Sequence, residues 1–200
     1  MPELPAPLPP DQRTVGQLVA ESIRAYGAHF WRALPLGLPL LAADQASVGR
    51  HMGGAQLLIF WGTTPLFAAA YVWACSLILG RRPTAAAFGL AVLIWLPFPA
   101  LRALYLLPGI AWLAFIGLAV PAALVERLGF REALARGRQL GAADYVHSLG
   151  SLAALVVVVG VSEQVLAELL HSQGQHVYRV ALGISDLVLT PLLYLGAALL

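Results

Sequence analysis

The chain has 200 residues, of which 60% are hydrophobic and 11% are charged, and its mean hydropathy is +0.78. Soluble domains carry roughly 25% charged residues, so this composition excludes a water-soluble globular domain. The net charge is only +2 and no basic tract carries interleaved aromatic residues, which excludes a nucleic-acid partner.

The N-terminal segment, residues 1–12, contains five prolines, which predicts a disordered, extended tail. The remainder, residues 13–200, is predicted to form a single transmembrane helical domain. Its first helix is predicted to begin after Thr14, because Thr14 and Gln17 have the spacing of a capping box. The apolar residues that follow have helical spacing and the charged ones lie off that stripe. We therefore expect an amphipathic helix at the membrane interface that leads into the first span.

Six apolar stretches are each predicted to cross the membrane. About 20 apolar residues at ~1.5 Å per residue are enough to span the hydrocarbon core. The stretch Ala55 to Leu79 has 25 residues and no charge. The predicted spans cover about residues 30–46, 55–79, 85–107, 110–125, 145–170 and 177–200.

The first of these spans is the shortest. Only eleven uncharged residues, from Ala33 to Ala43, lie between two charged ones, and two prolines interrupt them. Eleven helical residues cover ~16 Å, about half of the hydrocarbon core. The segment therefore extends through Arg32 and Asp44 as a kinked span, or it enters the membrane and returns on the same side. We expect the kinked span and keep the re-entrant segment as the alternative.

Proline and glycine predict where the other helices bend or end. Pro65 predicts a kink in the second span, and the Pro108-Gly109 pair is predicted to separate the third span from the fourth. Residues 126–144, between the fourth and fifth spans, form a polar connector with its own helical pattern. We expect this connector to be a cytoplasmic amphipathic helix.

Charged residues in this connector have two predicted roles. Glu132 and Arg136 have the i,i+4 spacing of a stabilising ion pair. Arg127, Arg131 and Arg138 remain as candidate contacts for lipid phosphates, and each attracts an anionic leaflet by about 1 kcal/mol. The simpler interpretation is that these arginines anchor the topology by reaching to the interface.

The arginines also predict the orientation of the chain. With six spans, nine arginines lie on the side that holds both termini and three lie on the other side. Positive residues concentrate on the cytoplasmic side of membrane proteins. The sequence therefore predicts a multi-pass protein with its N-terminus and C-terminus in the cytoplasm.

Three charged residues fall inside the predicted spans. Arg102, Glu163 and Asp186 lie roughly 9 to 14 Å from the outer ends of their spans. An unpaired charge at that depth costs at least ~2 kcal/mol, so each needs a partner or water. We predict an intramembrane polar cluster in which Arg102 pairs with Asp186, Glu163 or both. The cluster is either a structural link between helices or a polar cavity, open to the outside, for a solute or a lipid headgroup.

Parts of the chain resemble a known bacterial membrane domain. The residues that carry the resemblance are Thr14–Leu18, Pro108-Gly109, Ala119–Glu126, Gly129, Ala133–Arg136 and Leu140-Gly141. They are similar to the integral membrane domain related to that of glycerophosphodiester phosphodiesterases, which has free-standing relatives of unknown function. The chain departs from that pattern at Gly137, where the family has Ser, and at Tyr145, where it has Trp. The resemblance implies the bacterial inner membrane, and with no phosphodiesterase barrel in this chain it implies no catalytic residue.

The reactive motifs of hydrolases and nucleotide-binding enzymes do not occur in the chain. The single cysteine, Cys75, excludes an intrachain disulfide and a paired-cysteine zinc site, and the five histidines are scattered. We therefore predict no catalytic residue, metal or cofactor. The first hypothesis is a non-catalytic protein that binds membrane lipids or another membrane protein. The alternatives are a transporter or channel-like protein that uses the outer polar cavity, and a membrane-bound enzyme for lipid phosphodiesters or its anchor.

Overall fold

The computed structural model describes residues 14–47, 54–104, 106–170 and 175–200, so the predicted tail lies outside the described part. The described residues form an all-α helix bundle without strands, as predicted. The elements are α1 Val15–Ala28, α2 Phe30–Ala33, the 3₁₀ helix η2 Leu34–Gly37, α3 Leu38–Ser47, α4 Gly54–Leu79, α5 Ala85–Trp95, α6 Phe98–Leu104, α7 Leu106–Ile116, α8 Ala119–Val125, α9 Phe130–Ala143, α10 Tyr145–Leu170 and α11 Gln175–Leu199.

Four stretches of helix are long and apolar enough to cross a membrane. They are Gly54–Leu79, Leu106–Val125, Tyr145–Leu166 and Arg179–Leu199. They coincide with four of the six predicted spans and identify a membrane protein. The other two predicted spans consist of shorter pieces: α2, η2 and α3 follow one another over residues 30–47, and Ala85–Leu101 is a shorter apolar stretch. Six spans therefore remain a prediction.

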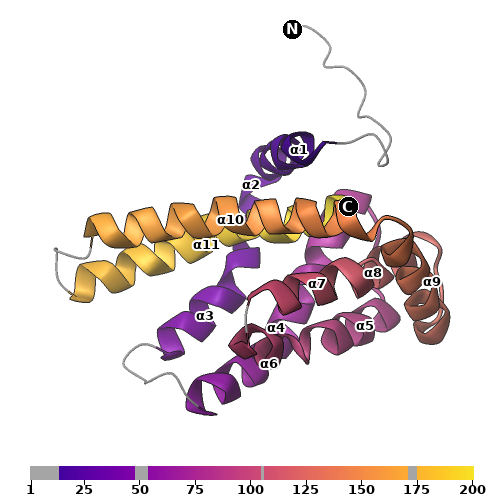
Figure 1. The fold of residues 1–200 in the computed structure, drawn as a ribbon, viewed down its shortest axis with the longest axis horizontal. Coiled ribbons are helices and arrows are strands. Elements are labelled where there is room, and N and C mark those ends of the chain that lie inside the picture. Colours follow the sequence, from indigo (N-terminus) through magenta and orange to yellow (C-terminus); the bar gives the residue numbers. More distant parts are fainter. Residues whose placement is uncertain (1–13, 48–53, 105, 171–174) are drawn as a thin grey trace, which may run out of the picture.

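The two C-terminal helices organise the bundle. Figure 1 shows α10 and α11 side by side, with α3 to α8 on one side of the pair and α1 on the other. α9 lies at one end, where it packs against α7 and α8. Along α10, large apolar residues such as Val157, Val161 and Leu169 are more than half exposed, as expected for a surface that faces lipid.

The predicted capping box at the start of α1 is confirmed. Thr14 N donates to Gln17 Oε1 (2.7 Å), and Gln17 N donates to Thr14 Oγ1 (3.3 Å). α1 packs on α10 and α11 through its buried residues Leu18 and Ser22. The bundle therefore covers one face of this amphipathic helix. Only the opposite face is left to lie at the membrane interface, as the sequence predicts.

The predicted break between the third and fourth spans falls between α6 and α7, before Leu106 and a few residues ahead of Pro108-Gly109. Both residues lie within the first turns of α7, where a proline interrupts no helical hydrogen bond because the first amides have no partner inside the helix. The helices also break at residues 96–97 and 117–118. The second break has a simple cause: Pro121 has no amide hydrogen to donate to Gly117 O, four residues earlier.

Aromatic side chains donate to backbone carbonyls near these breaks and in the short helix α2. Hydrocarbon offers no water, so a carbonyl that a helix leaves open needs a donor from within the protein. Three tryptophans and one tyrosine provide such donors. Trp73 Nε1 donates to Arg32 O (3.1 Å), Trp112 Nε1 to Ile94 O (2.9 Å), Trp61 Nε1 to Leu96 O (3.0 Å) and Tyr71 OH to Gly117 O (3.0 Å).

Replacing Trp112 with phenylalanine is expected to lower the free energy of unfolding by about 1–3 kcal/mol, because it leaves the Ile94 carbonyl without its indole donor. The measurement is unfolding of the purified protein by titration from a mild detergent into SDS. Trp31→Phe is the control, since Trp31 is 81% exposed. Equal stability of the two variants would contradict this role for the indole.

Candidate functional site

A cavity of about 280 Å³ lies between the α10–α11 pair and the helices α3 to α7. Its walls are mostly apolar and include Ile110, Leu113, Leu152 and Val156. The volume is close to the lower end of the range of ligand pockets, roughly 300–1,000 Å³. A dry cavity of about 150 Å³ holds one benzene molecule, so this cavity has room for about a dozen non-hydrogen atoms.

Aromatic rings form one wall of this cavity. Successive ring centroids are 6.2 Å apart for Phe60 and Phe67, 5.3 Å for Phe67 and Trp95, and 5.7 Å for Trp95 and Tyr194. Phe98 meets the edge of Trp95 at 4.9 Å. All five residues line the cavity, and they come from α4, α5, α6 and α11. The wall is therefore an apolar surface of packed aromatic rings assembled from four helices.

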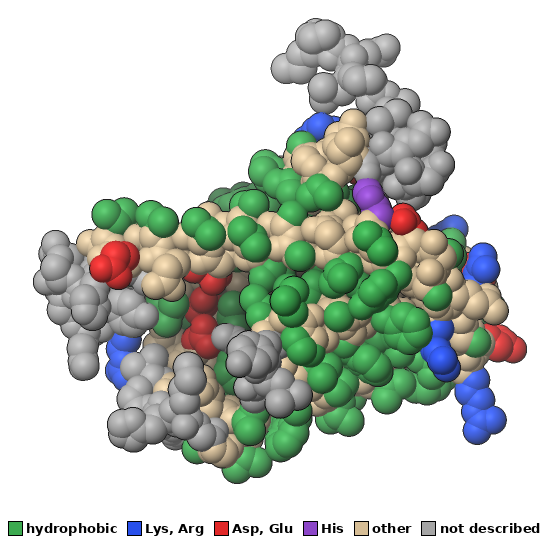
Figure 2. All heavy atoms as spheres, in the orientation of Figure 1, with side chains coloured by type: hydrophobic (Ala, Val, Ile, Leu, Met, Phe, Trp, Pro, Cys, Tyr) green, Lys and Arg blue, Asp and Glu red, His purple; other side chains and the backbone are tan. Residues whose placement is uncertain are grey.

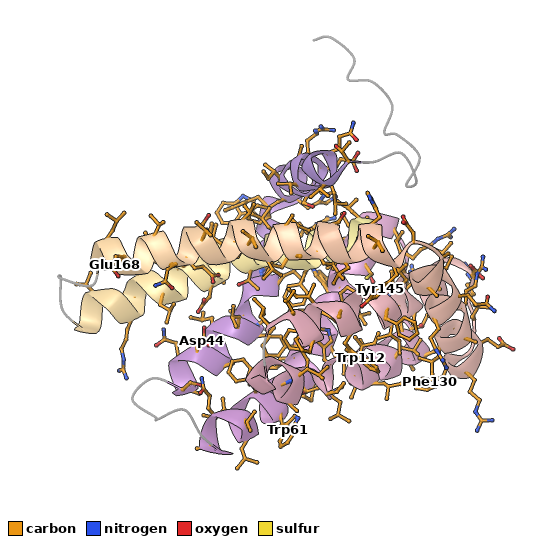
Figure 3. The ribbon with its side chains drawn as sticks, viewed as in Figure 1. Asp44, Trp61, Trp112, Phe130, Tyr145 and Glu168 are labelled. Atoms are coloured by element: carbon orange, nitrogen blue, oxygen red, sulfur yellow. The ribbon has the colours of Figure 1, made fainter. Side chains whose placement is uncertain are left out.

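Two carboxylates also line the cavity, Asp44 from α3 and Glu163 from α10. Figure 2 shows acidic side chains inside a hollow beneath α10, and Figure 3 shows Asp44 on α3 below the α10–α11 pair. The sequence analysis included Glu163 among its candidates but missed Asp44. The signal was present, since the eleven uncharged residues before Asp44 are too few to cross the membrane without it.

The other two members of the predicted polar cluster have different positions. Asp186 is 1% exposed and lies on α11, where its backbone carbonyl leaves no room for a Cβ atom at Gly37 of η2, and it does not line the cavity. Arg102 belongs to α6, but its side chain is outside the described part of the structure. The pairing of Arg102 with Asp186 or Glu163 therefore stays a prediction.

Among the other polar side chains that line the cavity, three make no hydrogen bond within the described ranges, and the sequence analysis did not find them. They are the indole of Trp95 on α5 and the hydroxyls of Thr190 and Tyr194 on α11. Thr190 is 3% exposed and Tyr194 is 4% exposed. Within the described ranges, the polar atoms of all three are buried and make no hydrogen bond. No sequence pattern signals such groups, because whether a donor is satisfied depends on its neighbours in the fold.

The predicted amphipathic connector forms α9, but the predicted ion pair within it is wrong. Arg136 Nε donates to Oε1 of Glu126 at 3.0 Å, and Glu126 precedes the start of the helix. Glu132 Oε2 instead accepts a hydrogen bond from Gly129 N at 3.4 Å and so caps the N-terminus of α9. The pairing differs because Arg127, with φ of 52°, turns the chain back and brings Glu126 beside the helix.

The three arginines proposed as lipid-phosphate contacts lie at this same end of the molecule. Arg127, Arg131 and Arg138 are exposed, and the Arg138 guanidinium lies 5.9 Å from the centre of the Phe115 ring. Figure 2 shows basic side chains gathered at this end. The arrangement leaves these side chains able to reach an adjacent membrane surface.

In the described ranges, no three His, Cys, Asp or Glu side chains come together as metal ligands. The chain matches no protein-family profile, no curated protein and no solved structure.

Proposed function

We propose that this protein is a non-catalytic membrane protein that binds the hydrocarbon part of a membrane lipid in the cavity beneath α10 and α11. The observation that carries this proposal is the cavity itself, a space of about 280 Å³ with mostly apolar walls. In a bilayer, lipid chains are the most abundant molecules that fit such a space. Binding requires no catalytic group, in agreement with the absence of reactive motifs in the sequence.

The proposal includes a location in the bacterial inner membrane with both termini in the cytoplasm. Its supports are the excess of arginines on the predicted inner side and the resemblance to the membrane domain related to that of glycerophosphodiester phosphodiesterases. The exposed arginines of the α9 end then contact the phosphates of anionic lipids, which concentrate on the cytoplasmic face. Another membrane protein remains the alternative partner for that end.

Solute transport is a second candidate, favoured by a specific observation. Asp44 and Glu163 line the cavity, and the helices around it are broken between α2 and α3 and between α5 and α6. Broken helices with buried charges mark transport sites in other membrane proteins. A transporter would move a small solute across sealed vesicles, whereas a lipid-binding protein would retain a lipid through purification.

Filling the cavity is expected to abolish lipid retention. Gly160 on α10 lines the cavity, and a Cβ atom there would meet nothing within 4 Å, so Gly160→Leu places a side chain in open space. Mass spectrometry of the purified protein should show at least tenfold less co-purified lipid than the wild type. The matched control is Gly150→Leu, because Gly150 lies on the same helix, has equally open space and does not line the cavity. Equal lipid content in both variants would contradict the proposal.

A further inference from the structure

We infer that the ligand carries a carbonyl oxygen, which accepts hydrogen bonds from the donor set Trp95, Thr190 and Tyr194, two of them at a time. This inference rests on the proposed function and specifies which chemical group of the lipid lies inside the cavity. The three donors line the same cavity, where Thr190 and Tyr194 are four residues apart on α11 and the ring centroids of Tyr194 and Trp95 are 5.7 Å apart.

Comparable hydroxyls in the same cavity already have partners. Thr64 also lines the cavity, and its hydroxyl donates to the carbonyl four residues earlier at 3.2 Å. Tyr71 lines the cavity as well, and its hydroxyl donates to Gly117 O at 3.0 Å. Thr190 and Tyr194 make no such bond to any described residue. A buried hydroxyl without a hydrogen-bond partner destabilises the fold. A bound ligand that accepts these hydrogen bonds would remove that cost.

The tryptophans show the same contrast. Trp61, Trp73 and Trp112 each donate to a backbone carbonyl within 3.1 Å. Trp95 alone among the tryptophans lines the cavity, and its Nε1 atom is buried and makes no hydrogen bond within the described ranges. An indole N–H can only donate, so the missing partner must be an acceptor.

The surroundings of these donors restrict the acceptor further. The rings of Phe67, Phe98 and Tyr194 surround the Trp95 indole, with centroids between 4.9 and 5.7 Å from it. A flat group packs well against such rings, and a carbonyl is flat and uncharged. Long hydrocarbon chains in membranes carry this group as an acyl ester or as a prenylated quinone. Both satisfy the same donors, and the experiment separates them.

The test compares three probes in one detergent by isothermal titration calorimetry. The probes are a monoacylglycerol, the alkyl ether glycerol of equal chain length, which lacks the carbonyl, and a short-chain prenylated quinone. The wild-type protein is expected to bind the ester about tenfold more tightly than the ether, as one hydrogen bond would give. Tighter binding of the quinone than of the ester would identify a prenylated quinone as the ligand. Weaker binding of the quinone would identify an acyl ester.

Tyr194→Phe removes one donor and keeps the ring. It should reduce the preference for ester over ether at least threefold, whereas Tyr26→Phe should leave it unchanged. Tyr26 is the matched control, since its buried hydroxyl also makes no hydrogen bond within the described ranges but does not line the cavity. Equal affinity for ester and ether in the wild type, or an unchanged preference in Tyr194→Phe, would overturn the carbonyl inference and leave lipid binding intact. Failure of all three probes to bind would overturn the proposed function as well.

Discussion

Gly141→Leu is expected to destabilise the protein by about 3 kcal/mol, the upper end of the range for overpacking. A Cβ atom at Gly141 would overlap the backbone carbonyl of Phe115 in α7, and one at Gly137 would overlap the backbone of Ala119 in α8. Together with the buried Ala133, these glycines form a stripe of small residues along α9 at intervals of four. Backbone cannot move aside as a flexible side chain can, so α9 would have to leave its place on α7 and α8.

The measurement is the free energy of unfolding in the same SDS titration as above, together with the rate of trypsin cleavage. Trypsin cuts after the arginines of α9, so a displaced helix should be cut several times faster in the folded protein. Gly150→Leu serves again as the control, because it adds the same side chain where a Cβ meets nothing within 4 Å. Unchanged stability and unchanged cleavage in Gly141→Leu would mean that α9 does not depend on this close contact.

The sequence predicted the long helices well, because their apolar stretches are continuous. The predicted span 55–79 became Gly54–Leu79, and 145–170 became Tyr145–Leu170. The breaks were harder to predict, because the effect of a proline depends on its place in a helix. Pro108 lies in the first turn of α7, where it interrupts no helical hydrogen bond, whereas Pro121 cannot donate to Gly117 O, four residues earlier. A break in lipid also needs a donor from another helix, and sequence spacing does not supply that information.

The cavity was only partly predictable for a related reason. Glu163 stood out because a carboxylate in an apolar stretch is rare, whereas Asp44 was missed, although the short first span pointed to it. Trp95, Thr190 and Tyr194 are ordinary residues for a membrane helix, and similar residues elsewhere in the chain have partners within the protein. The assembled helices are needed to show which of these groups lack a partner among the described residues.

The two ends of α10 are expected to be reached by a reagent from opposite sides of the membrane. α10 has 26 residues and is therefore ~39 Å long, which exceeds the ~30 Å hydrocarbon core. Figure 3 shows Glu168 near one end of α10 and Tyr145 at the other, next to α9. The arginine distribution predicts that the α9 end is cytoplasmic, so a cysteine at position 168 should face outward.

Cys75 is the only cysteine and is fully buried, so Cys75→Ala gives a background without thiols. In that background, Glu168→Cys should react with a membrane-impermeant maleimide in intact spheroplasts, whereas Ala135→Cys, on the exposed face of α9, should react only after lysis. The difference should be nearly all-or-none, because a bilayer blocks the charged reagent completely. The reverse pattern would invert the orientation while leaving the bundle intact. Reaction of both cysteines in intact spheroplasts would mean that α10 does not cross the membrane, and the cavity beside it would then open to water and not to lipid.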